Sequence, residues 1–288
     1  MKNVSHLKTA ILEQFKGALF RFTPSDLVRR LKRNHPEYPS ARIRDAVKAL
    51  VRQGILVYSH RLSATQIEVN YGTRVPIAPC LTLLIGGTGP EPLESGVVIR
   101  LAGGEAFGMG DHPTTRLVLK SLCRAGAWLS KVGAPPGCEA LDIGTGTGVL
   151  ALAAARLGFA PVTALDNDPL ALHEARSNVA LNRLTDAIAV SDTPLAQLPA
   201  GRFTLVLANL RPPTLHGMVP QMARVSRAPA VWIVSGFRPD ESDSLAGKLE
   251  KRGANLVWRQ IENGWGAFAA AFYQEALKGL LVDLEKPR

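Results

Sequence analysis

Cysteine, and the pairings of cysteine or histidine that are typical of metal sites, are scarce in this chain. Only 3 of its 288 residues are cysteine, and no two of them stand in a CxxC pair. A disulfide scaffold and a cysteine-ligated zinc site are therefore not expected. The 6 histidines include no HExxH pair, so the sequence predicts no metal in the active site.

The chain also lacks long apolar runs and a triphosphate-binding loop. No stretch of about 18 uninterrupted apolar residues occurs, and the N-terminus shows no signal-peptide pattern. We therefore expect a cytoplasmic protein without a membrane partner. The absence of a GxxxxGK[ST] motif argues against a nucleoside triphosphate as the ligand.

The sequence does have enough apolar residues for two cores, and its charge is unevenly spread. Hydrophobic residues make up 46% of the chain, which at this length suffices for one large and one small domain. Residues 1–75 hold 14 Lys and Arg against 5 Asp and Glu, a net charge of +9. Residues 76–288 hold 20 against 19, so nearly all of the total of +10 lies in the first quarter.

A glycine-rich turn between a strand pattern and an alanine-rich helix pattern is the most informative motif. Gly144, Gly146 and Gly148 form a GxGxG turn that lets the backbone bend sharply and approach a ligand. Asp166 stands 22 positions after Gly144 and ends the next strand pattern, near the spacing at which a carboxylate reaches ribose hydroxyls. We interpret this as the first βαβ unit of a Rossmann-like, nucleotide- or nucleoside-binding sheet.

The residues of the turn favour one kind of cofactor. Asp142 precedes the glycines, and its carboxylate can hold the loop amides or a ligand ammonium. A ligand with a ribose and an amino-acid moiety but no phosphate fits this arrangement. The sequence therefore predicts S-adenosylmethionine as the cofactor, with S-adenosylhomocysteine as the product.

Five segments occur in the order and spacing of the ribosomal-protein methyltransferases called PrmA. They are AFGMGDHPTTRL from residue 106, LDIGTGTGVLALAAARLG from 141, ALDNDPLALHEARSNVALN from 164, LVLANL from 205 and VSGF from 234. The chain resembles this family over roughly residues 95 to 273. The resemblance implies an S-adenosylmethionine-dependent protein methyltransferase of class I, with a seven-stranded Rossmann-like sheet and helices on both faces.

The resemblance implies cofactor-binding positions residue by residue. The glycine turn matches the loop under the methionine part of the cofactor, and Asp142 matches the carboxylate behind that loop. Asp166 matches the ribose ligand, and Asp192 matches a position beside the adenine. The implied cofactor-binding set is Phe107, Thr114, Thr115, Asp142, Gly144, Thr145, Gly146, Gly148, Asp166, Asn167, Asp192 and Asn209.

The same resemblance implies where the methyl group is transferred. Asn209 matches the polar residue at the end of the fourth strand, next to the transferred methyl. We expect Asn209 and the carbonyl of Leu210 to orient the lone pair of an acceptor amine. His112 has two interpretations, a proton acceptor or a residue that holds the closing loop. Trp265, in a late hairpin, is expected to belong to the core.

The sequence also departs from the family pattern. Met109 and Asp111 stand where the family usually carries Thr. The contiguous Asn-Pro-Pro-Tyr motif of amide and adenine methylation is absent after Asn209, which disfavours those acceptors. The compact substrate-recognition domain that precedes the catalytic domain in that family is not recognisable here.

The first quarter of the chain has a different pattern. Apolar spacing predicts a helix over residues 5–16 behind a Ser5 cap, a second helix that Thr23 caps, and a third from Ser40 that Gly54 stops. Two short strands, 55–58 and 66–71, then form a hairpin. This order resembles a winged-helix domain, whose positive charge indicates contact with RNA, DNA or an acidic ribonucleoprotein surface.

We therefore predict three parts: a basic winged-helix domain over 1–75, a proline- and glycine-rich linker over 76–95, and a methyltransferase domain over 96–288. Three functions stay open. The leading one is N-methylation of a protein that is ribosomal or associated with nucleic acid. The second is methylation of RNA or DNA, with an extruded base in the cleft. The third is a non-catalytic regulator that senses S-adenosylmethionine.

Overall fold

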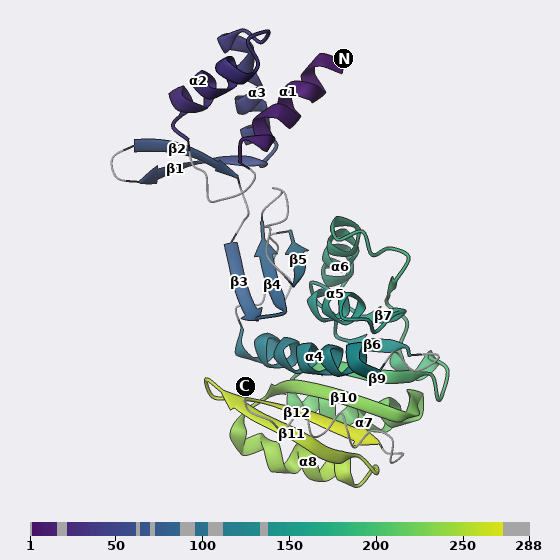
Figure 1. Cartoon of the computed structure of the whole chain (residues 1–288). Helices are drawn as coiled ribbons and strands as arrows, with labels where there is room; N and C mark the ends of the chain where they lie inside the picture. Colours follow the sequence, from purple (N-terminus) through teal and green to yellow (C-terminus); the bar gives the residue numbers. More distant parts are fainter. Residues whose placement is uncertain are drawn as a thin grey trace. The chain divides into compact units, whose positions relative to one another are not determined.

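The computed structural model describes residues 2–15, 22–61, 64–69, 73–86, 96–102, 112–132 and 138–272 (Figure 1). The chain divides into two compact units, which we describe separately. Unit 1 comprises Met1–Arg74 and Leu84–Ser95, and unit 2 comprises Val75–Leu83 and Gly96–Arg288. None of the helices in the described ranges combines the length and the apolarity that a membrane span requires.

Unit 1 contains three helices followed by a hairpin. The helices are α1 (Lys2–Glu13), α2 (Pro24–Asn34) and α3 (Ser40–Arg52), and the hairpin pairs β1 (Leu56–Arg61) with β2 (Ala64–Val69) in antiparallel register. This confirms the predicted order of elements, whereas the winged-helix assignment stays a prediction. One boundary was wrong, because α1 begins at residue 2 and Ser5 therefore lies inside the helix rather than at its cap.

Local chemistry explains where the helices of unit 1 begin and end. The hydroxyl of Thr23 accepts a hydrogen bond from the backbone N–H of Asp26, which caps α2 as predicted. Gly54 follows the end of α3 with a φ of +70°. Its N–H donates to the carbonyl of Val51 in the last turn of that helix. The apolar faces of all three helices pack with the hairpin into one small core: Leu7, Ile11, Leu27, Leu31, Ile43, Leu50, Leu56 and Ile67 are all buried.

Unit 2 is built on a seven-stranded sheet with the spatial order β11-β12-β10-β9-β6-β7-β8. The neighbouring strands β10, β9, β6, β7 and β8 pair in parallel, whereas β12 pairs antiparallel with both β10 and β11. The strands are β6 (Ala140–Ile143), β7 (Val162–Leu165), β8 (Ile188–Ser191), β9 (Phe203–Asn209), β10 (Ser226–Phe237), β11 (Asn255–Glu262) and β12 (Trp265–Phe272). The predicted seven-stranded Rossmann-like sheet is confirmed.

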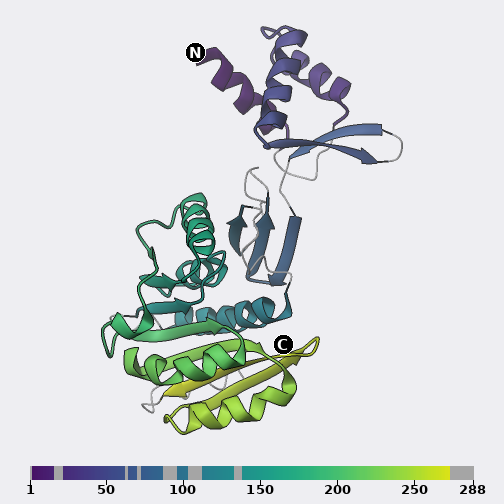
Figure 2. The same cartoon turned by 180° about the vertical axis from the view of Figure 1, so that it is seen from behind.

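Helices cover both faces of this sheet, as Figures 1 and 2 show. Helices α4 (Pro113–Val132), α5 (Val149–Arg156) and α6 (Pro169–Leu181) form one layer, and α7 (Pro212–Val225) and α8 (Ser242–Glu250) form the other. The central strands are buried from both sides, so they read as nearly continuous apolar runs.

The segment predicted to be a linker contains strands. Strands β3 (Thr73–Ala78) and β4 (Leu81–Ile85) join β5 (Val97–Leu101) in a three-stranded sheet. The prolines and glycines that suggested an irregular linker lie mostly in the turns and in residues 87–95, which are outside the described ranges. The division at 1–75, 76–95 and 96–288 therefore stays a prediction, and the structure adds that residues 76–78 and 81–85 of the predicted linker belong to strands.

Candidate active site

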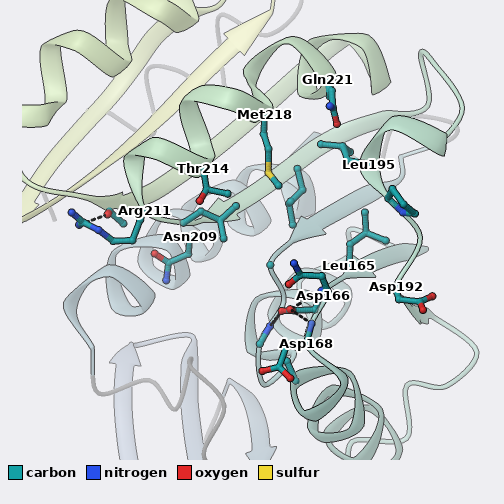
Figure 3. Close-up of a pocket in the computed structure, with 18 of the residues that line it drawn as sticks. Leu165, Asp166, Asp168, Asp192, Leu195, Asn209, Arg211, Thr214, Met218 and Gln221 are labelled. Carbon is teal, nitrogen blue, oxygen red and sulfur yellow. Dashed lines mark hydrogen bonds between the residues drawn. The ribbon is translucent and has the colours of Figure 1, made fainter.

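A cavity of about 730 Å³ lies where the strand order of the seven-stranded sheet reverses (Figure 3). Strands β7 and β8 follow β6 in one direction, whereas β9 and β10 extend in the other direction. Ligands of open α/β sheets bind at such a switch point, outside the carboxyl ends of the strands. Residues that follow β6, β7, β8 and β9 line the cavity, so the fold brings together segments that are far apart in the sequence.

The glycine turn after β6 forms the floor of the cavity. Gly144 has a φ of +72°, and a Cβ there would lie 2.5 Å from Cδ2 of Leu210. The N–H groups of Gly144 and Thr145 both donate to the Leu165 carbonyl, each at 2.8 Å, which anchors the turn to the end of β7. The positive φ therefore favours glycine at position 144, and a Cβ there would also displace the end of the Leu210 side chain.

Asp166, the first residue after β7, joins two parts of the site. Its Oδ2 accepts a hydrogen bond from the N–H of Gly146 at 2.9 Å, and its Oδ1 accepts from Asn167 and Asp168 at 2.8 and 3.1 Å. Figure 3 shows this carboxylate between the glycine turn and the start of α6. Asp166 thus fixes the turn while it lines the cavity.

Asp142 is fully buried behind the turn. Its Oδ2 accepts from the Thr145 hydroxyl at 2.6 Å and from the Ala151 N–H at 3.1 Å, and so holds the turn and the first residues of α5. Its Oδ1 has no hydrogen-bond partner in the described part of the chain. Burial raises the pKa of this carboxyl to about 7, although the two hydrogen bonds act in the opposite direction.

The raised pKa of Asp142 predicts a pH dependence of stability. The folded carboxyl binds its proton more tightly than the unfolded one, so the contribution of Asp142 to the unfolding free energy is highest below about pH 4 and falls until about pH 7. The loss is at most about 1.4 kcal/mol per pH unit. Denaturant unfolding of the wild type and of Asp142→Asn between about pH 4 and pH 7 measures this contribution. The unfolding free energy of the variant should lack the part of the decrease with pH that is due to Asp142. Parallel curves for the two proteins would contradict the prediction.

One end of the cavity is formed by the residues that follow β8. Asp192 and Thr193 lie directly after that strand, and Leu195 opens the short helix η1 (Leu195–Gln197). The Thr193 hydroxyl forms a hydrogen bond of 2.6 Å with the Ser191 hydroxyl, which orders the turn. In Figure 3, Asp192 and Asn209 lie toward opposite ends of the cavity, with Asp166 between them.

Asn209 ends β9 at the other side of the switch point. Its Nδ2 donates to the hydroxyl of the buried Thr115 at 3.4 Å, whereas its buried Oδ1 has no partner among the described residues. Next to it, a Cβ on Gly236 would lie 2.2 Å from the Leu210 carbonyl oxygen. Only glycine therefore permits this close approach of the end of β10 to the backbone of Leu210.

The wall beside Asn209 is aromatic and basic. The Trp265 ring lies edge-on to His112, with 4.9 Å between centroids, and the guanidinium carbons of Arg211 and Arg238 lie 5.3 and 5.4 Å from its centre. Arg211 is held by the Gly236 carbonyl and by Glu241. Trp265 lines the cavity, so its predicted place in the core was wrong, because β12 begins at this residue and directs it to the sheet edge.

His112 is engaged with the start of α4. Its Nδ1 lies 2.7 Å from the Thr114 hydroxyl and accepts from the Thr114 N–H at 3.3 Å. These contacts are those expected of a residue that holds the loop before α4, although His112 also lines the cavity. The choice between the two roles stays a prediction.

The structure brings together most of the predicted site residues. Those that line the cavity are His112, Thr114, Gly144, Gly146, Asp166, Asn167, Asp192, Asn209 and Leu210. Four others, Thr115, Asp142, Thr145 and Gly148, do not line it. Thr115 accepts a hydrogen bond from Asn209, Asp142 and Thr145 are bonded to each other within the turn, and Gly148, with a φ of +82°, precedes α5. Phe107, Met109 and Asp111 lie outside the described residues.

The cavity wall that α7 provides was not predicted from the sequence. Thr214, Met218 and Gln221 lie on one face of that helix and line the cavity, and Figure 3 shows Met218 reaching toward Leu165 and Asp166. Their spacing of four and three residues is a helical signal that was present in the sequence. This spacing predicts a common helix face but does not say what that face lies against. A face with both polar and apolar residues can be assigned to a cavity only when the order of the strands is known.

The cavity fits S-adenosylmethionine on three observations. Its volume lies in the range of small-molecule sites, about 300 to 1,000 Å³. Gly144 and Gly146 line the cavity without side chains, and a carboxylate follows β7 at the place where ribose hydroxyls are bound in sheets of this kind. Asn209, which lines the cavity, leaves one buried acceptor oxygen without a partner in the described part of the chain.

Comparisons with known proteins agree with this geometry. The family model of ribosomal protein L11 methyltransferase (PrmA) matches residues 73–272. Ribosomal protein L11 methyltransferase of Pelobacter propionicus is 42% identical over 148 residues, which are 51% of this chain and 47% of that protein. The corresponding protein of Trichlorobacter lovleyi is 38% identical over 179 residues, which are 62% of this chain and 52% of that protein.

A solved structure extends the likeness to the fold. The crystal structure of ribosomal protein L11 methylase from Lactobacillus delbrueckii subsp. bulgaricus superposes with a TM-score of 0.61 at 27% identity, covering 70% of this chain and 99% of that chain. The chain spans about half the length of the curated relatives it matches. Residues 1–72 lie outside the match to the family model.

Proposed function

Because this chain belongs to the PrmA family, we propose that it transfers a methyl group from S-adenosylmethionine to a nitrogen atom of a ribosomal protein. S-adenosylhomocysteine is the product. The observation that carries the proposal is the buried Oδ1 of Asn209 at the switch point of the sheet, which has no partner among the residues that the structure describes. An acceptor oxygen in that place suits a substrate that arrives with an N–H donor.

The residues that would hold the cofactor surround the cavity. Asp166 would bind the ribose hydroxyls, Asp192 would lie beside the adenine, and the backbone of Gly144 and Gly146 would lie under the methionine part. When bound, S-adenosylmethionine supplies a methyl group on a sulfonium that is already activated for displacement. The protein therefore needs no covalent intermediate.

The chain's own contribution is to align the acceptor and to exclude water. An amine must arrive uncharged, because only the neutral form has a lone pair. Asn209 Oδ1 and the Leu210 carbonyl would accept hydrogen bonds from the N–H groups of this amine. These bonds would direct its lone pair toward the methyl. Alignment of this kind can lower a barrier by several kcal/mol, on the order of 7 to 11 in the best cases.

The acceptor class follows from the relatives. The proteins that match this chain are named ribosomal protein L11 methyltransferases, so we propose ribosomal protein L11 as the target. The missing Asn-Pro-Pro-Tyr motif is in keeping with an amine, rather than an amide or an exocyclic base nitrogen.

The test is transfer of labelled methyl from S-adenosylmethionine to ribosomal protein L11 of the same source, in parallel with whole ribosomes. Label should appear on the protein, be lost on protease treatment and survive nuclease. Excess S-adenosylhomocysteine is the matched control and should abolish labelling. Label that only nuclease removes would contradict protein methylation and indicate that RNA is the substrate. No label, with cofactor binding intact in calorimetry, would indicate that the protein senses S-adenosylmethionine without transferring its methyl group.

A further inference from the structure

Helix α3 of unit 1 exposes one continuous stripe. Its buried face is formed by Ile43, Ala46, Val47 and Leu50, and the opposite face carries Ala41, Arg44, Asp45, Lys48 and Arg52, all exposed. The spacing of these exposed residues keeps them within one third of the helix circumference. Over the length of α3 this stripe runs for about 16 Å.

The stripe is basic, and so is the neighbouring helix. Three of its five side chains are cationic against one carboxylate, and α3 adds Arg42 beside it. Helix α2, which packs against α3, carries Arg29, Arg30, Lys32 and Arg33 against the single Asp26. Concentrated positive charge of this kind attracts phosphate backbones over a distance of several ångströms.

A groove between α2 and α3 adds a place for a phosphate. It measures about 360 Å³ and lies beside Arg44 of the stripe. Its lining is Pro24, Ser25, Val28, Arg29, Lys32, Ser40 and Arg44. Lys32 is fixed there, because its Nζ donates to the Pro36 and Tyr38 carbonyls. Cations from two helices and two hydroxyls are the groups that bind phosphate oxygens.

The shape and chemistry of the stripe favour duplex DNA over other partners. A helix with its side chains is about 10 to 12 Å wide and enters the B-form major groove, which is about 12 Å wide. The major groove of A-form RNA is too narrow for a helix. Protein interfaces are depleted of charge at their centre and enriched in aromatic residues, whereas this stripe carries three cations and no aromatic side chain.

We propose that unit 1 binds duplex DNA, with α3 in the major groove and a backbone phosphate in the groove between α2 and α3. Arg44, Lys48 and Arg52 reach the base edges and flanking phosphates, and Arg29 and Lys32 hold the backbone. This binding lies in residues 1–72, outside the family match, and it is independent of methyl transfer.

The experiment measures binding of the full chain to a short DNA duplex, and to an RNA duplex of the same sequence, by fluorescence anisotropy between about 50 and 200 mM salt. We expect DNA binding that weakens steeply with salt, and RNA binding at least about tenfold weaker. The triple variant Arg44→Ala, Lys48→Ala, Arg52→Ala should lose about 100-fold or more in DNA affinity, with a smaller salt slope.

The matched control removes the same charge from unit 2. Lys248, Lys251 and Arg252 are exposed on and just after α8, and their replacement by alanine should change DNA affinity by less than about threefold. Equal losses in the two variants would overturn the assignment to α3. Equal binding of both duplexes would overturn the choice of DNA, and no binding at low salt would overturn the proposal. Thermal unfolding of each variant checks that it folds.

Discussion

Replacement of Asp166 by alanine is expected to weaken binding of S-adenosylmethionine by about 30-fold or more. The change removes the acceptors for the N–H groups of Gly146, Asn167 and Asp168, so the glycine turn keeps its hydrogen bonds to the Leu165 carbonyl but loses the one to Asp166. It also removes the proposed ribose ligand. A hydrogen bond to a charged group contributes about 1.5 to 3 kcal/mol, and about 1.4 kcal/mol corresponds to tenfold in affinity. Isothermal titration calorimetry measures the change.

Two further variants separate the role of Asp166 from a general effect of charge. Asp186→Ala removes an exposed carboxylate that does not line the cavity, and its cofactor affinity should equal that of the wild type. Asp166→Asn keeps the shape and one acceptor oxygen, so its loss should be smaller than that of Asp166→Ala. If Asp166→Ala binds the cofactor as tightly as the wild type, Asp166 has no role at the ribose.

Replacement of Asn209 by alanine should lower kcat by about 100- to 1,000-fold, the range found when one positioned polar group is removed from an active site. Cofactor affinity should change by much less, because Asn209 lies toward the opposite end of the cavity from Asp192. Turnover with saturating cofactor, together with calorimetry, separates the two effects. Unchanged turnover would remove Asn209 from the site of transfer.

The side chain behind Asn209 provides a graded test of the same role. Thr115→Val keeps the size of Thr115 but removes the hydroxyl that accepts from Asn209 Nδ2. Its kcat should fall less than that of Asn209→Ala, because the amide stays in place but is no longer fixed. Asn255→Ala, which makes the same amide change at an exposed position of β11, is the control and should leave kcat unaltered.

Much of the fold follows from local patterns. The glycine turn, the alanine-rich α5 and the carboxylate after β7 fix one βαβ unit through backbone conformation, helix propensity and spacing. Thr23 and Gly54 mark helix boundaries for equally local reasons. The failures occurred where local signals are ambiguous. Prolines in residues 76–85 suggested a linker, although Pro76 lies within β3.

The candidate site was only partly accessible from the sequence. Asp166, Asp192 and Asn209 end or follow strands, so parallel pairing alone brings them to one edge of the sheet. The wall formed by Thr214, Met218 and Gln221 depends instead on which side of the sheet α7 packs. Trp265 comes to the cavity because β12 is inserted antiparallel between β10 and β11, and such long-range pairing leaves no local trace.

The Rossmann-like sheet, the glycine turn, the carboxylates of the site and the basic character of the first quarter can all be predicted from the amino-acid sequence. These properties depend on residue type and short spacing. The three-dimensional packing was needed to see that Asn209 leaves a buried acceptor oxygen without a partner in the described residues, and that Trp265 and α7 complete the cavity. It also gathered the cations of α2 and α3 around one groove. These features arise from the packing of elements that are distant in the chain, which no local pattern specifies.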